Sequence, residues 1–205
     1  VKKQTENINQ LSPFDVRWVN QLRSFDDVTD THGFVITNAS VKFPNGKDAP
    51  IMIIGSDYPA LAAGPYSELV YSGTIQSLAA PEIVSTDFYD NKTLGYDIEL
   101  GTRFEINGKT AIVGVITKDA KGFTSPLIYT TADKARYYSE MPSSQVSGII
   151  VTVLDHSKIE SVVSQINHNA PNLKAWTADQ IRTNTIVNVM TANNMGMSFA
   201  TLVLF

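Results

Sequence analysis

The sequence contains no cysteine among its 205 residues. This absence excludes disulfide bonds, thiol catalysis and zinc–thiolate sites. Clusters of basic residues are absent too, since Lys2-Lys3 is the only adjacent basic pair and the formal net charge is −4. A nucleic-acid surface needs a clustered basic patch. We therefore expect no nucleic-acid partner.

A complete membrane-spanning run is also missing. A spanning helix needs about 20 mostly apolar residues, and the uncharged run over residues 196–205 supplies about half of that length. Residues 186–195, which precede this run, are mixed in character and include three Asn. We expect residues 181–205 to form a helix leading into a truncated transmembrane segment, and the chain to be a piece of a membrane protein. The alternative is the C-terminal core helix of a soluble domain.

The first 60 residues combine a helical pattern with two β patterns. Ser12 is a good N-cap and Pro13 suits a first helical position, so a helix is predicted from Ser12 to about Phe25. A strand over residues 34–43 and an apolar strand over residues 51–54 follow. An Asn-Gly turn joins these two strands.

The middle of the chain is rich in short strands, and its last third reads strand, helix, strand. Residues 102–106 and 109–117 flank an Asn-Gly pair and predict a hairpin. In the last third, the strand over residues 148–154 is followed by Ser157-Lys158-Ile159-Glu160, which has the spacing of a capping box. A short final strand is expected over residues 173–176.

These patterns predict an α+β fold with an inserted β-rich lobe. Residues 1–58 and 141–180 would form one discontinuous, ferredoxin-like α+β layer. Residues 59–140 would form the β-rich insertion, and residues 181–205 the helix that follows.

Two short motifs resemble catalytic loops, but the residues around them do not fit those motifs. Asn107-Gly108-Lys109-Thr110 ends like a phosphate-binding loop, but Arg103 stands where that motif needs Gly, and the turn lies between two strands. Residues 196–200 loosely resemble a nucleophile elbow without its second Gly. We interpret the first as a hairpin turn and the second as part of the apolar run.

The three histidines, His32, His156 and His168, show no metal-ligand spacing. Asp30 and His32 could offer a carboxylate and an imidazole, but a solvated turn before a strand is the simpler interpretation. We therefore predict no catalytic, cofactor-binding or metal-binding residues, and no cofactor.

Aromatic residues concentrate in the middle segment. Core packing accounts for most of them, and a tip that docks a partner protein or an apolar ligand would use the same residue types. The aromatic residues in question are Tyr58, Tyr66, Tyr71, Phe88, Tyr89, Tyr96 and Phe123.

Three stretches together resemble a known family. Residues 95–115, which read GYDIELGTRFEINGKTAIVGV, resemble a segment in the extracytoplasmic domain of MacB/FtsX-type ABC transporter permeases. Pro126 to Ala135 is similar to the strand and short helix that follow in that family, and Ile51 to Asp57 resembles its earlier strand. The order of these parts extends over nearly the whole chain.

The resemblance implies a location, an architecture and a set of partners. The domain would lie on the extracytoplasmic, periplasmic side of a bacterial cell membrane, with a "porter" layer near the bilayer and an inserted "sabre" lobe. It would not be an enzyme, because ATP is hydrolysed by a separate nucleotide-binding domain or subunit. Implied partners are that ABC ATPase, a periplasmic adaptor or a lipoprotein, the membrane through flanking helices, and a second permease in a dimer.

Three hypotheses about function follow. The first is a non-catalytic permease domain that transmits ATP-driven motion to export or to lipoprotein release. The second is a membrane-anchored sensor domain that binds a ligand or peptide. The third is a hydrolase using Asp30 and His32.

Overall fold

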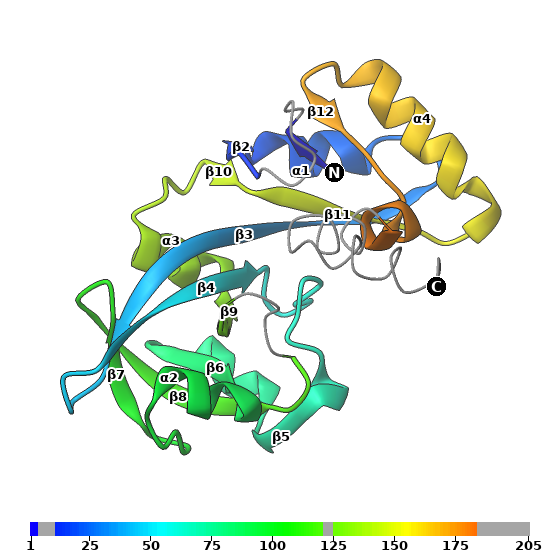
Figure 1. The fold of residues 1–205 in the computed structure, drawn as a ribbon. Helices are drawn as coiled ribbons and strands as arrows, with labels where there is room; N and C mark the ends of the chain where they lie inside the picture. The colour runs from blue at the N-terminus through cyan, green and yellow to red at the C-terminus, as the bar shows by residue number, and fades with distance from the viewer. Residues whose placement is uncertain (4–10, 121–124, 184–205) are drawn as a thin grey trace, which may run out of the picture.

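The computed structural model describes residues 1–3, 11–120 and 125–183, and its ribbon is drawn in Figure 1. The helices are α1 (Arg17–Arg23), α2 (Asn91–Leu94), α3 (Ala132–Ser139) and α4 (Ile159–Asn169), with 3₁₀ turns η1 (Ser67–Leu69), η2 (Ile75–Ala79), η3 (Phe88–Asp90) and η4 (His156–Lys158). The strands are β1 (Lys2–Lys3), β2 (Phe14–Asp15), β3 (Val28–Lys42), β4 (Asp48–Ser56), β5 (Val70–Gly73), β6 (Ile83–Asp87), β7 (Arg103–Ile106), β8 (Lys109–Thr117), β9 (Leu127–Thr131), β10 (Gln145–Val146), β11 (Gly148–Val153) and β12 (Leu173–Lys174). The predicted α+β class is confirmed.

One eight-stranded mixed sheet organises the molecule, in the order β11-β3-β4-β9-β6-β8-β5. Strand β7 pairs with both β3 and β8. The strands β3, β4, β9, β6, β8 and β7 therefore close into a small barrel (Figure 1). Closure removes the exposed edges that these strands would otherwise present.

The barrel encloses the larger of the hydrophobic cores. Alternate residues of β3 and β4 point inward, as the period of a strand requires, and Val35, Val41, Ile51 and Ile53 are almost fully buried. They pack in one cluster with residues of β7, β8 and α3. The predicted turn between β3 and β4 is present, with Gly46 at φ 82°.

A second core lies where α1 and α4 pack against β11 and the first part of β3 (Figure 1). Its buried residues include Leu22 from α1, Ile149 from β11, and Val162 and Ile166 from α4. The long strand β3 runs through both cores. The division into residues 1–58 plus 141–180 and residues 59–140 stays a prediction.

The predicted start of the first helix was wrong. Phe14 and Asp15 form β2, which pairs with β10, and the helix begins at Arg17. The backbone N–H of Val16 donates to Ser144 at 2.8 Å. Pairing with a distant segment has therefore overridden the local signal of Ser12 and Pro13. Asp15 still accepts a hydrogen bond from the backbone N–H of Arg17 at 2.8 Å.

The predicted capping box at Ser157 was also wrong. Asp155 is the cap, because its carboxylate accepts hydrogen bonds from the backbone N–H of Ser157 at 2.9 Å and from its hydroxyl at 2.8 Å. A 3₁₀ turn then precedes α4. Near the C-terminus, residues 178–183 are helical, and Thr177 and Gln180 cap this helix reciprocally at 3.1 Å.

No helix in residues 1–3, 11–120 and 125–183 is long and apolar enough to cross a membrane. Most of the predicted helix over residues 181–205 lies outside the described residues.

Candidate functional site

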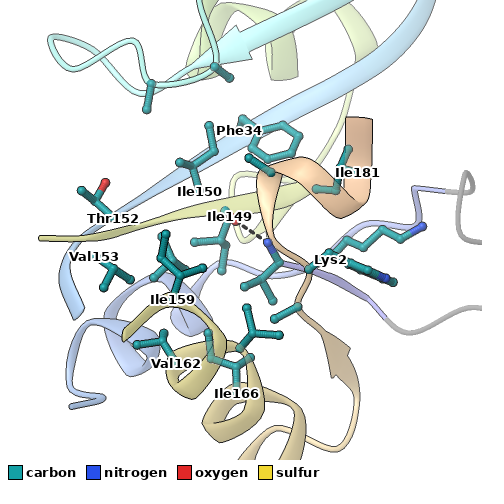
Figure 2. Close-up of a pocket in the computed structure, with 18 of the residues that line it drawn as sticks. Lys2, Phe34, Ile149, Ile150, Thr152, Val153, Ile159, Val162, Ile166 and Ile181 are labelled. Atoms are coloured by element: carbon teal, nitrogen blue, oxygen red, sulfur yellow. Dashed lines mark hydrogen bonds between the residues drawn. The ribbon is translucent and has the colours of Figure 1, made fainter. Parts of the chain in front are cut away.

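A cavity of about 840 Å³ opens beside β11. Its lining is mainly aliphatic and comes from β11, α4, the start of the chain and Ile181 of the last helix, as Figure 2 shows. Phe34, Ile36 and Ile54 extend it across the outer face of β3 and β4. The volume is in the range of small-molecule and peptide sites. We call this cavity the β11 groove.

The backbone of β11 contributes hydrogen-bonding groups to the groove. The backbone N–H of Ile149 donates to Val1 at 2.8 Å, and the amino group of Val1 donates back to Ile149 at 2.6 Å. Ile149 therefore turns its peptide groups away from β3. Because peptide groups alternate in direction along an antiparallel strand, those of Val151 face the groove as well.

The groove disfavours charge near Lys2. Burial lowers the pKa of Lys2, whose ammonium lies 5.2 Å from the centre of the Trp176 ring. This shift has the sign expected where water is displaced from a cation.

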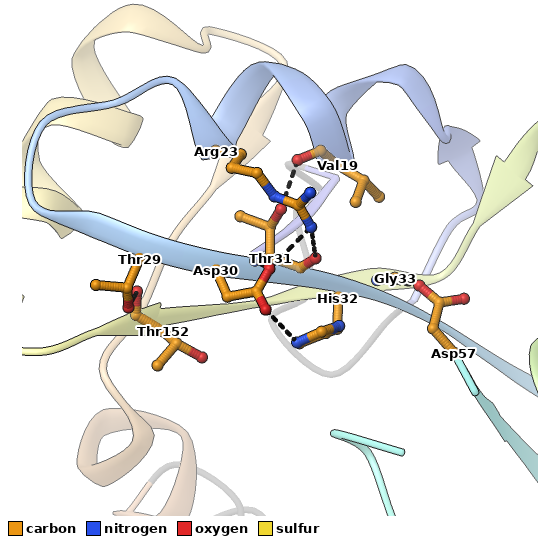
Figure 3. Close-up of polar contacts among 9 residues, drawn as sticks. All are labelled: Val19, Arg23, Thr29, Asp30, Thr31, His32, Gly33, Asp57 and Thr152. Carbon is orange, nitrogen blue, oxygen red and sulfur yellow. Dashed lines mark hydrogen bonds and ion pairs between the residues drawn. The ribbon is translucent and has the colours of Figure 1, made fainter. Parts of the chain in front are cut away.

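Asp30 and His32 lie in β3 and not in a turn, so that prediction was wrong. The imidazole Nε2 lies 3.1 Å from the Asp30 carboxylate, which also pairs with Arg23 at 2.8 Å (Figure 3). Residues two apart share one face of a strand, which explains why the two side chains meet. Hydrogen bonding from the backbone of Thr31, together with His32 and Arg23, holds the pKa of Asp30 below its usual value.

Among the described residues, no hydroxyl is hydrogen-bonded to the Asp30 carboxylate or the His32 imidazole. The hydroxyl of Thr31 donates to the backbone of Val19 at 2.7 Å, and that of Thr29 donates to the backbone of Thr152 at 2.9 Å. Nucleophilic catalysis needs a hydroxyl or thiol within hydrogen-bond reach of the base. The Asp30 carboxylate links β3 to α1 through its ion pair with Arg23.

An exposed aromatic cluster marks the barrel's far end. Tyr71, Phe88 and Tyr89 are 60%, 44% and 42% exposed. Their rings contact one another at centroid distances of 5.3 and 5.4 Å. The Lys118 ammonium lies 5.9 Å from both tyrosine rings. Exposed aromatic residues beside a cation are typical of protein-binding surfaces.

Comparisons with known proteins agree on the fold. No protein-family model matches the sequence, and no curated protein matches it at a significant level. Two transporter domains are among the solved structures that match. The extracellular domain of the noncanonic ABC-type transporter YknZ from Gram-positive bacteria is 15% identical, with a TM-score of 0.59 over 85% of this chain and 94% of that chain. The periplasmic region of MacB from Actinobacillus actinomycetemcomitans is 15% identical, with a TM-score of 0.61 over 88% and 85%.

The chain has the fold of the MacB and YknZ extracytoplasmic domains. The three sequence stretches predicted this MacB-like fold, and the structure confirms it. Because the sequences are only 15% identical, the comparison shows a shared architecture and does not identify site residues in this chain.

The other sequence motifs occupy structural positions in the MacB-like fold. Asn107-Gly108 forms the β7–β8 turn, with Asn107 at φ 49° and Gly108 at φ 76°, so the hairpin interpretation is confirmed. No three metal-ligating side chains gather anywhere in the described part of the chain. Phe123 and residues 196–200 lie outside the described residues.

Sequence reasoning missed the β11 groove. The signal is present in residues 148–153, where apolar side chains follow one another without alternation. Such a run predicts a strand covered on both faces. Among the described residues, α4 covers one face of β11, and Ile150 and Thr152 lie on the other face and line the groove.

Proposed function

We propose that this chain is the extracytoplasmic domain of an ABC transporter permease and transmits ATP-driven motion across the membrane. The observation that carries the proposal is the fold match to MacB and YknZ, which covers most of both chains. The proposed partners are an ABC ATPase, a periplasmic adaptor or lipoprotein, and a second permease.

The architecture supports a mechanical role. The closed barrel and the α1–α4 layer share the continuous strand β3, so a push on one is carried to the other through an unbroken backbone ladder. A layer attached to membrane helices would move as a rigid body when they move. Such coupling needs no catalytic residue.

The absence of cysteine makes a direct test practical. Spin labels at Asn45→Cys, on the exposed β3–β4 turn, would report the distance between two permease protomers in the complete transporter, by pulsed electron resonance. ATP is expected to shift this distance by several ångströms, about the scale of known rigid-body rearrangements. An unchanged distance while ATP is being hydrolysed would contradict the proposal.

A second label pair serves as the control. Asn45→Cys and Ser164→Cys lie on exposed sites of the barrel and of α4 in one chain. Their mutual distance should stay constant with ATP if the domain moves as one body.

A membrane-anchored sensor is the second candidate, and the β11 groove is the observation that favours it. The complete gene separates the two candidates. A signalling domain in the complete gene, in place of an ATPase neighbour, would favour the sensor.

A further inference from the structure

We propose that Asn45, in the β3–β4 turn, is a site of spontaneous covalent modification, at which the side-chain amide is lost as ammonia and aspartate or isoaspartate remains. The chain has a second Asn-Gly pair, Asn107-Gly108, and the contacts of Asn107 protect it from the same reaction. The co-reactant is water, so the modification needs no enzyme and does not depend on the transport role.

The reaction joins the asparagine side chain to the backbone of the next residue. Hydroxide removes the proton of that backbone N–H, and the nitrogen forms a bond with the side-chain carbonyl carbon, Cγ. The Cγ–Nδ2 bond then breaks, and the amide leaves as ammonia after taking a proton from water. A second water opens the five-membered imide ring at either of its carbonyl groups, which gives aspartate or isoaspartate. Glycine favours the attack because it has no Cβ to hinder the approach.

The β3–β4 turn holds Asn45 in a reactive arrangement. Residues 44–47 are all exposed, and Figure 1 shows the turn projecting from the end of the sheet. The Oδ1 atom of Asn45 accepts a hydrogen bond from the Lys47 backbone N–H at 3.1 Å. This local bond folds the side chain back over the Gly46 peptide. The same N–H stabilises the negative charge that develops on Oδ1 during the attack, as the donors of an oxyanion hole do.

Gly46 supplies the attacking nitrogen. Its φ is 82°, and a Cβ built on it would meet no atom within 4 Å, so the protein leaves space around this peptide. The Gly46 N–H donates to the Phe43 carbonyl at 2.9 Å, and this bond must open before the attack. One neutral hydrogen bond of this kind slows the reaction only about fivefold.

Asn107 is held by two segments outside its own turn. Its Oδ1 accepts from the Ser40 backbone N–H at 3.0 Å, and its Nδ2 donates to the Tyr138 carbonyl at 3.1 Å. The leaving amide is thus itself a bonded group. Both bonds must break before Cγ can move to the Gly108 nitrogen, which slows the reaction by about twentyfold or more. The lower barrier therefore belongs to Asn45.

Peptide mapping of the intact folded protein by mass spectrometry tests the proposal. Each modification raises the mass of its peptide by about 1 Da, and chromatography separates the isoaspartyl from the aspartyl form. After incubation at mildly alkaline pH, we expect Asn45 to react at least about fivefold faster than Asn107. In denaturing urea neither side chain is held, so the two rates should converge.

Two variants test the chemistry at the turn. Asn45→Gln keeps an amide, but its longer side chain would have to close a six-membered ring, and the fast reaction should disappear. Gly46→Ala adds a Cβ beside the attacking nitrogen and should slow the reaction at Asn45, while Asn107 reacts as before. Equal rates at the two sites in the folded protein, or a faster reaction at Asn107, would overturn the proposal. A rate difference that persists unchanged in urea would also overturn it, because the fold would then play no part.

Discussion

Gly55 of β4 lies directly against Ala135 of α3. A Cβ built on Gly55 would lie 2.3 Å from the Ala135 Cβ and 3.0 Å from the Ala132 Cα. Real Cβ atoms do not approach so closely, so the helix can lie at this distance only because residue 55 has no side chain.

Gly55→Ala should therefore destabilise the barrel core. We expect a loss of about 1–3 kcal/mol in the free energy of unfolding, because the substitution overpacks a dense contact. Urea denaturation followed by circular dichroism measures it.

A double variant separates this clash from other effects. Gly55→Ala with Ala135→Gly relieves the Cβ–Cβ clash but leaves the Ala132 contact and adds a helix glycine, which costs about 1 kcal/mol. The double variant should lose less stability than the sum of the two single variants. Simple additivity would show that α3 does not depend on this approach.

Asn107 does more than turn the β7–β8 hairpin. Its side-chain oxygen accepts from the Ser40 backbone N–H at 3.0 Å, and its amide donates to the Tyr138 carbonyl at 3.1 Å. Asn107→Gly keeps the turn but removes both bonds, and we expect a loss of about 1 kcal/mol. Asn107→Ala should cost about 1 kcal/mol more, because alanine resists the positive φ.

The other turn asparagine is the matched control. Asn45 accepts only a local hydrogen bond, from the Lys47 backbone N–H at 3.1 Å. Asn45→Ala should change the unfolding free energy by no more than about 0.5 kcal/mol. If Asn45→Ala and Asn107→Ala lost the same amount, Asn107 would be only a turn residue.

Local signals explain which elements were predictable. The two Asn-Gly turns and the strands beside them follow from neighbouring residues, and the structure contains both. The start of α1 depends on the pairing of Phe14 with Val146, which are distant in sequence. The pairing of β7 with β3 closes the barrel in the same non-local way. Neither contact has a signature within a short window of sequence.

The site was less predictable than the fold for a related reason. The sequence showed Asp30 and His32 two positions apart and suggested a solvated turn. The structure places both residues in a strand, where Asp30 pairs with Arg23. The β11 groove depends on which face of β11 the described residues leave uncovered. That property is set by the placement of α4, and periodicity alone does not reveal it.

The aromatic cluster at the barrel tip should tolerate loss of its side chains. Phe88→Ser and Tyr89→Ser each remove a ring that is more than 40% exposed. We expect each to change the free energy of unfolding by less than about 1 kcal/mol. In a complete transporter, the double variant should reduce transport if the tip docks a partner.

A buried ring of the same barrel provides the contrast. Phe104 is almost fully buried, and Phe104→Ala should cost about 3–5 kcal/mol. Thermal unfolding monitored by circular dichroism distinguishes the cases. If Phe88→Ser lowered the free energy of unfolding as much as Phe104→Ala, the Phe88 ring would be part of the hydrophobic core. That result would argue against a docking surface.

Lys134 should make stability depend on pH in the alkaline range. Its ammonium donates to the backbone carbonyls of Leu78, Ala80 and Ile83 at 2.6, 3.0 and 2.6 Å, which ties α3 to the turn before β6. Burial nevertheless lowers the pKa of Lys134 from 10.5 to about 8. Between these two values the unfolded chain holds a proton that the folded protein has released, so this group's contribution to the free energy of unfolding rises with pH. The contribution is complete above pH 10.5 and is lost as pH falls toward 8.

Comparing the unmodified chain with Lys134→Met isolates this effect, because other titrating groups act on both proteins. Urea denaturation at pH 8, 9 and 10.5 should show the unmodified chain gaining stability relative to Lys134→Met at each step. Lys158→Met removes an exposed ammonium near α4 and leaves Lys134 in place, so it should follow the unmodified chain. A constant difference between the unmodified chain and Lys134→Met across this range would mean that water reaches the Lys134 ammonium in the folded protein.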